Sequence, residues 1–143
     1  MKNNFFFIKE FSNIYKNPSK LSEVTSQILY GEKFKILSKK NNWIKIKTSF
    51  DNYVGIIRKN KFNQNFKPTK KIYKLKSKIF KKKNKKFIST NKFLFFASGV
   101  SVRKQEKEYV EFEKNKWIKK RDTKAIFHQE KNFIKIFKLF LNS

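Results

Sequence analysis

Apolar residues between Ile14 and Phe62 fall in short runs that alternate with polar residues, and this pattern constrains the fold more than any other feature. In the run that starts at Trp43, alternation with a period of two places Ile44 and Ile46 on one face of a strand. Such runs recur at roughly 8–12-residue spacing with Asn, Ser or Gly between them, which indicates a small β-barrel or sandwich.

The connections between the runs favour the same fold class. Asn41-Asn42 and Asp51-Asn52 suit hairpin turns, because Asn and Asp tolerate left-handed backbone. Residues 63–71 include Pro68 and have no apolar periodicity, so we expect a linker there.

Residues 72–126 repeat the strand pattern less regularly. The lysine run Lys81–Lys86 is expected to be a solvated loop between two strands. Trp43-Ile44 and Trp117-Ile118 occur late in each half, which suggests an internal duplication. We therefore expect a second, divergent barrel over these residues.

The end of the chain changes to helical spacing. Five large apolar residues recur at positions i, i+3, i+4, i+7 and i+8, namely Phe133, Ile136, Phe137, Phe140 and Leu141. This spacing predicts an amphipathic α-helix within residues 128–143, whose apolar face covers a barrel or a following domain.

The charge is extreme, because 37 Lys and Arg residues face 10 Asp and Glu residues and give a net charge of +27. Such a balance attracts nucleic acid or another polyanion. Only three of the basic residues are Arg, and Lys, Asn, Ile and Phe, which have A/T-rich codons, are abundant. We therefore interpret much of the lysine excess as codon bias and keep nucleic-acid binding as an alternative function.

Several kinds of chemistry are not expected. The chain has no Cys and a single His, His128, so neither a thiol nucleophile nor a metal site can be assembled, and no cofactor is expected. The apolar run Phe5–Ile8 is shorter than the roughly 7–15 residues of a signal peptide. The default expectation is a cytoplasmic protein.

The first half also carries a recognisable order of motifs. A Pro-containing opening at Asn13–Pro18 is followed by a Q-x-L-x-G-E step at Gln27–Glu32, by Trp43–Ile46 in place of W-x-x-V, and by D-x-Y-x-G at Asp51–Gly55. This order resembles the bacterial SH3 (SH3b) domain of NlpC-type cell-wall cysteine peptidases. The likeness is specific over about residues 11–62 and looser over 70–126.

The resemblance implies an all-β fold of two tandem small SH3-like barrels followed by the C-terminal amphipathic α-helix. The expected boundaries are 11–62 for the first barrel, 63–71 for the linker, 72–126 for the second barrel and 128–143 for the helix. In that family the helix leads into a papain-like domain that cleaves γ-D-glutamyl bonds to a diamino acid in murein peptides. Because the sequence stops at Ser143 without a Cys, we expect no peptidase activity from this chain, as in a truncated or split enzyme.

The same resemblance implies a ligand site. In such enzymes an aromatic hydroxyl and a carboxylate of the first barrel help to hold the free amino end of the peptide, and Tyr53 with Glu32 or Asp51 matches these groups. Trp43 is expected to line the core or a binding groove. Structural roles remain open beside these, since Tyr53 suits a half-buried strand position and Asp51 suits a turn.

The sequence therefore predicts a non-catalytic module that binds a murein-type peptide or works with a catalytic peptidase domain. The alternative is a basic SH3-like nucleic-acid-binding protein, in which aromatic residues among lysines stack on bases.

Overall fold

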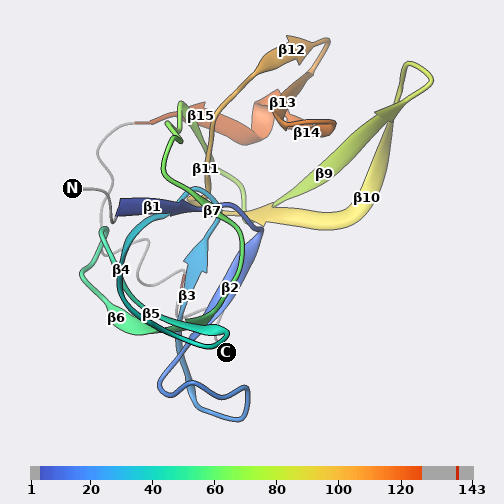
Figure 1. Ribbon diagram of the computed structural model, residues 1–143. Coiled ribbons are helices and arrows are strands. Elements are labelled where there is room, and N and C mark those ends of the chain that lie inside the picture. Colours follow the sequence, from blue (N-terminus) through green and yellow to red (C-terminus); the bar gives the residue numbers. More distant parts are fainter. Residues whose placement is uncertain (1–3, 127–137, 139–143) are drawn as a thin grey trace. The chain divides into compact units, whose positions relative to one another are not determined.

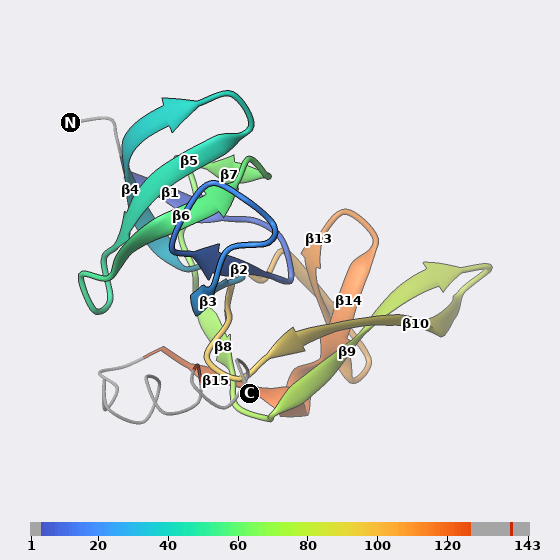
Figure 2. The ribbon, with the colours of Figure 1, turned by 90° about the horizontal axis from the view of Figure 1, so that it is seen from below.

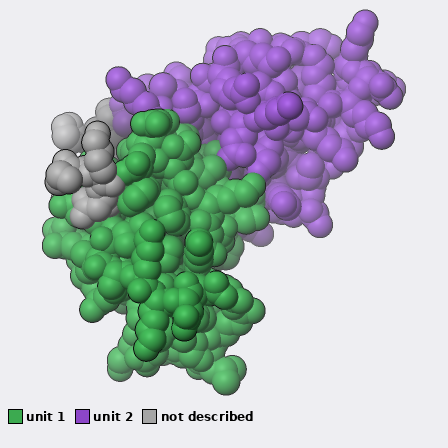
Figure 3. Space-filling model, in the orientation of Figure 1, with its two compact units in different colours: residues 1–66, 128–143 green, residues 67–127 purple. Residues whose placement is uncertain are grey.

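The computed structural model describes residues 4–126 and residue 138, and the chain divides into two units. Unit 1 comprises residues 1–66 and 128–143, and unit 2 comprises residues 67–127; they are coloured separately in Figure 3. Unit 2 starts at Lys67, and its first strand starts at Lys70, within the range 63–71 that the sequence indicated as a linker.

The described residues of unit 1 form seven strands, which pair in a single antiparallel sheet (Figure 1). They are β1 (Asn4–Phe7), β2 (Phe11–Tyr15), β3 (Val24–Leu29), β4 (Lys33–Lys40), β5 (Trp43–Thr48), β6 (Val54–Arg58) and β7 (Phe62–Asn63). The order across the sheet is β3-β2-β6-β5-β4-β1-β7.

The predicted all-β class is confirmed in unit 1, but the strands of the predicted SH3-like barrel do not form a closed ring. The ladder of paired strands ends at β3 on one side and at the two-residue strand β7 on the other, so the sheet remains open. Bulges bend the sheet without closing it. In one, Thr25 is the extra residue on β3, opposite Ile14 and Tyr15 of β2; in the other, Leu37 is the extra residue on β4, and an extra residue increases local twist.

The core of unit 1 follows the predicted alternation. Ile44 and Ile46 on β5 are buried, as expected, and they pack with Phe7, Ile14, Ile28, Phe34 and Ile57. Asn41 and Asn52 have positive φ angles of 57° and 55°, which confirms the two turn positions. The neighbouring strands pair directly across the first turn, with Lys40 opposite Trp43.

Unit 2 is also all-β, but it is not a second closed barrel. Its strands form a five-stranded sheet, β10-β9-β14-β13-β12, and a three-stranded sheet, β11-β8-β15. They are β8 (Lys70–Ile72), β9 (Lys76–Lys83), β10 (Lys86–Phe95), β11 (Gly99–Val100), β12 (Lys104–Glu106), β13 (Tyr109–Glu113), β14 (Lys116–Lys119) and β15 (Thr123–Ala125), with the 3₁₀ helix η1 (Lys120–Asp122) before β15.

The lysine run at Lys81–Lys86 is not the loop that the sequence suggested. It forms the end of the β9–β10 hairpin, where only Asn84 and Lys85 leave the strands, with φ angles of 52° and 66°. Figures 1 and 2 show this hairpin extending beyond the other strands of unit 2. The lysines are tolerated in the strands because this end of the hairpin is mostly exposed.

The predicted C-terminal helix over 128–143 and His128 lie outside the described residues, apart from Lys138, whose backbone is helical. In the described part of the chain η1 is the longest helical segment. Within residues 4–126, no helix is long and apolar enough to cross a membrane.

Gly55 provides a test of the packing in unit 1. A Cβ atom added there would lie 2.2 Å from Cγ2 of Ile14, which is fully buried. We expect Gly55→Ala to lower the free energy of unfolding by about 1–3 kcal/mol, as overpacked cores do. In urea unfolding, Val54→Ala at a half-exposed position is the control and should change stability by less than about 0.5 kcal/mol.

The mechanism is tested by adding Ile14→Ala, which removes the clashing atom. The double variant should lose less stability than the sum of the two single variants, because the added methyl group then fills the space that Ile14 leaves. Simple additivity would contradict the proposed clash.

Candidate functional site

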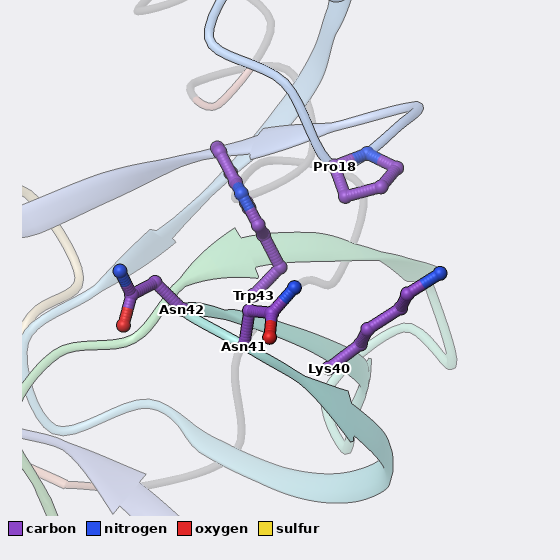
Figure 4. Close-up of a pocket in the computed structure, with 5 residues that line it drawn as sticks. All are labelled: Pro18, Lys40, Asn41, Asn42 and Trp43. Carbon is purple, nitrogen blue, oxygen red and sulfur yellow. The ribbon is translucent and has the colours of Figure 1, made fainter.

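A pocket of about 340 Å³ opens at one end of β5, and it is lined by Pro18, Lys40, Asn41, Asn42 and Trp43 (Figure 4). Pro18 comes from the connection between β2 and β3, whereas the other four residues come from the β4–β5 hairpin. Four of the five side chains are exposed, and Trp43 is half-buried. The pocket is therefore accessible, and its volume lies within the range of small-molecule sites.

Local hydrogen bonds fix both walls of the pocket. On the hairpin side, the backbone N–H of Lys59 donates to the carbonyl oxygen of Asn42 at 2.7 Å. On the other side, the backbone N–H of Asn17 donates to Oγ of Ser22 at 2.9 Å, which ties down the loop that carries Pro18. The pocket thus lies between two connections that are held in place.

Trp43 is the aromatic residue among the five that line this pocket. Its ring meets the ring of Tyr15 edge to face, with centroids 5.7 Å apart, and the Arg58 guanidinium lies 5.8 Å from its centre. Both contacts fix the indole orientation, since edge-to-face and cation–π geometries are favourable. The pocket therefore combines an aromatic surface, two amide side chains and the Lys40 ammonium.

Glu32 lies at the other end of the sheet and is engaged within the protein. Its Oε1 atom accepts a hydrogen bond of 3.0 Å from the backbone N–H of Leu29, and its Oε2 atom accepts one of 2.7 Å from Nζ of Lys138. The Glu32 side chain is only 10% exposed and that of Lys138 only 4%. Burial raises the pKa of the Glu32 carboxyl above its ordinary value of 4.5, and the Lys138 ammonium opposes part of that rise.

Asp51 and Tyr53 belong to the turn between β5 and β6. The Thr48 hydroxyl donates to the Asp51 carboxylate, and the backbone N–H of Tyr53 donates to Oγ1 of Thr48 at 3.1 Å. The Tyr53 ring packs against the core of unit 1. Asp51 is also close enough to Glu32 to raise the pKa of that carboxyl by charge repulsion.

The structure thus separates the predicted site residues into two groups. Trp43 begins β5, whereas Glu32, Asp51 and Tyr53 gather near Thr48, where β5 ends. Five residue steps along a strand correspond to about 17 Å. Two further residues lie with Glu32: Lys138 donates a hydrogen bond to its carboxylate, and the Lys138 ammonium lies over the Phe50 ring. No sequence pattern predicted either contact. Within the described residues, no three His, Cys, Asp or Glu side chains converge as a metal site would require.

Comparison with known proteins finds a family match within unit 1. Residues 14–61 match the family described as the bacterial dipeptidyl-peptidase SH3 domain. This match confirms the resemblance to the SH3b domains of NlpC-type proteins that the motifs between Asn13 and Gly55 indicated. No curated protein matches the chain.

The fold is also similar to a solved structure, that of an NlpC/P60 family protein from Bacillus cereus ATCC 10987. The TM-score is 0.66 at 12% sequence identity, and the alignment covers 86% of this chain and 56% of that protein. At this identity the likeness concerns the fold alone. The chain spans just over half the length of that relative.

Asn41 allows a test of the hairpin that shapes the pocket. With φ at 57°, Asn41 has left-handed backbone, which an alanine adopts at a cost of about 1–2 kcal/mol. We expect Asn41→Ala to lower the free energy of unfolding by about 1 kcal/mol and Asn41→Gly to preserve it. Asn42→Ala, in the same turn but without a positive φ, is the matched control in urea unfolding. Equal losses in both alanine variants would contradict this account.

The buried Glu32 carboxyl predicts a pH dependence of stability. A carboxyl whose pKa is raised in the folded state binds more protons there than in the unfolded state, so its contribution to stability falls as pH rises above about 4.5. We expect the stability of the wild type relative to Glu32→Gln to decrease from about pH 4 to about pH 8 in urea unfolding. A relative stability that increases with pH would show that the ion pair outweighs burial.

Proposed function

We propose that the SH3 domain at residues 14–61, which belongs to the bacterial dipeptidyl-peptidase type, is a non-catalytic module that binds murein-type peptides. The observation that carries this proposal is the open pocket on Trp43, bounded by Pro18 and by Lys40–Asn42. The peptide-binding role is supported by the match to a domain that is named for a peptidase family.

The chemistry of the pocket suits a short acidic peptide. An indole face packs against aliphatic side chains, while the amide groups of Asn41 and Asn42 can donate to and accept from peptide amides. Lys40 in the pocket and Arg58 beside Trp43 supply positive charge for the carboxylates of a γ-D-glutamyl peptide. The net charge of +27 favours such anionic ligands at long range.

The proposed role in the cell is substrate recognition beside a catalytic peptidase domain. Nucleic-acid binding, the alternative drawn from the charge, has no support from the comparisons, whereas the SH3 match favours a peptidase-associated module. Trp43, in an open pocket, is the residue on which the peptide proposal depends most.

The proposal is tested by titrating the ¹⁵N-labelled protein with an L-Ala-γ-D-Glu-diamino acid tripeptide and following chemical shifts. We expect the largest shifts at the Trp43 indole N–H and at Asn41 and Asn42. Trp43→Ala should weaken binding at least about tenfold, which corresponds to ~1.4 kcal/mol. Loss of the aromatic indole ring is the physical reason.

Tyr73→Ala is the matched control, because Tyr73 is an aromatic residue of unit 2 that is 47% exposed. It should bind the tripeptide as the wild type does. A second control replaces the tripeptide by single-stranded oligonucleotide at equal ionic strength. Absence of tripeptide-induced shifts near Trp43 at millimolar concentration would overturn the proposal.

A further inference from the structure

β10 lies at an open edge of the five-stranded sheet in unit 2. In the described residues β10 pairs with β9 and with no other strand, since it is the first strand in the order β10-β9-β14-β13-β12. Lys86, Ile88 and Ser89 are exposed, so this part of the strand is accessible to solvent. An open edge offers unpaired backbone groups to another extended segment.

The backbone of β10 alternates between groups that face β9 and groups that face the open edge. The N–H of Lys82 donates to Oδ1 of Asn115 at 2.8 Å, so it points away from β10. Phe87 lies opposite Lys82 in the ladder, and this pair is therefore of the non-hydrogen-bonded kind. The N–H and C=O groups of Phe87 then point to the open edge, and by the same alternation so do those of Ser89.

This edge is held in place by packing on one face of the strand. The Phe87 ring stacks on the Tyr109 ring with centroids 4.0 Å apart and meets the Trp117 ring edge to face at 5.0 Å. The Lys82 ammonium lies 5.9 Å from the centre of the Phe87 ring and forms an ion pair with Glu106. An edge that is already ordered loses little conformational freedom when a partner binds.

The charge around this edge selects the kind of partner. No Asp or Glu occurs between Asp51 and Glu106, and residues 76–95, which form the hairpin, include eight lysines. Lys86 and Ile88 lie on the opposite face of β10 from Phe87, and both are exposed. Lysines on an edge strand disfavour pairing with a second copy of the same strand. An acidic strand, in contrast, places its carboxylates beside them, and cross-strand pairs of opposite charge are stabilising.

We propose that the open edge of β10 binds an extended acidic segment of another protein by strand addition. The segment pairs with the backbone of Phe87 and Ser89, and it places an acidic side chain beside Lys86 and an apolar one beside Ile88. Backbone hydrogen bonds supply the affinity in this binding mode, and the neighbouring side chains supply the specificity. The proposal concerns unit 2 and does not rest on the function proposed for the Trp43 pocket.

Amide hydrogen exchange in the full chain tests strand addition directly. The probe is a heptapeptide of alternating Glu and Val with blocked ends. In the free protein the Ile88 amide should be protected by its bond to β9, whereas the Phe87 and Ser89 amides should exchange fast. With peptide at about ten times the dissociation constant, exchange at Phe87 and Ser89 should slow about tenfold, because only about one molecule in eleven is then unbound. Unchanged exchange at both amides in the presence of saturating peptide would rule out strand addition.

Ser89→Pro removes one outward N–H group from the edge. It should weaken peptide binding about five- to tenfold, because one backbone hydrogen bond is lost and the ring obstructs the edge. The sheet should tolerate the change, since proline is accepted in edge strands where the N–H faces solvent. Ser89→Ala keeps the N–H and is the matched control, which should bind as the wild type does. Equal affinity of the two variants would contradict backbone pairing at β10.

Lys86→Glu tests the selection by charge and leaves the backbone unaltered. It should weaken binding of the Glu/Val heptapeptide about three- to tenfold and strengthen binding of a Lys/Val heptapeptide by a similar factor. Lys45→Glu, at an exposed position of β5 in unit 1, changes the net charge equally and is the control. If both variants weaken binding equally, the attraction is general and the proposal fails. The tripeptide titration at Trp43 is independent, so each proposal can fail alone.

Discussion

The alternation of side chains along β5 is the constraint on which the rest of unit 1 depends. Ile44, Ile46 and Thr48 face inward and are buried, which fixes the register of β5 against β4 on one side and β6 on the other. A slip of one residue would turn these side chains to solvent. The same register places Trp43 beside the pocket at one end of β5 and Thr48 beside Glu32 and Asp51 at the other.

Much of the strand register and turn placement in unit 1 was predictable, because both depend on residues that are close together in the sequence. A period of two over β5 and turn residues at Asn41 and Asn52 require only neighbouring positions, and the structure confirms them. The order of motifs along the chain predicted an SH3 domain in unit 1, and the family match over residues 14–61 confirms it. Trp43 was identified as a binding-groove candidate, and it lines the pocket, although ligand binding there remains a prediction.

The rest depends on contacts that no local pattern encodes. The pairing of β1 with β4 and β7 draws Phe7 into the core, yet the run Phe5–Ile8 gave no hint of its partner strands. Closure of a sheet depends on whether its two edge strands meet, so the open ladder could not be inferred from strand content. Glu32 and Lys138 are 106 positions apart in the sequence, so their ion pair could not be predicted from a local pattern. The motif resemblance had suggested that the Glu32 carboxylate was available to a ligand, whereas in the structure it accepts a hydrogen bond from Lys138.

The two ends of β5 therefore present opposite chemistry. Lys40 and Arg58 lie near Trp43 at one end, while Glu32 and Asp51 lie at the other. Their separation is about 17 Å along the strand. The two ends therefore differ in the charge of the groups that they favour. In a chain of net charge +27, the Glu32 carboxylate is thus paired with a buried lysine, whereas the basic groups near Trp43 lie beside an open pocket.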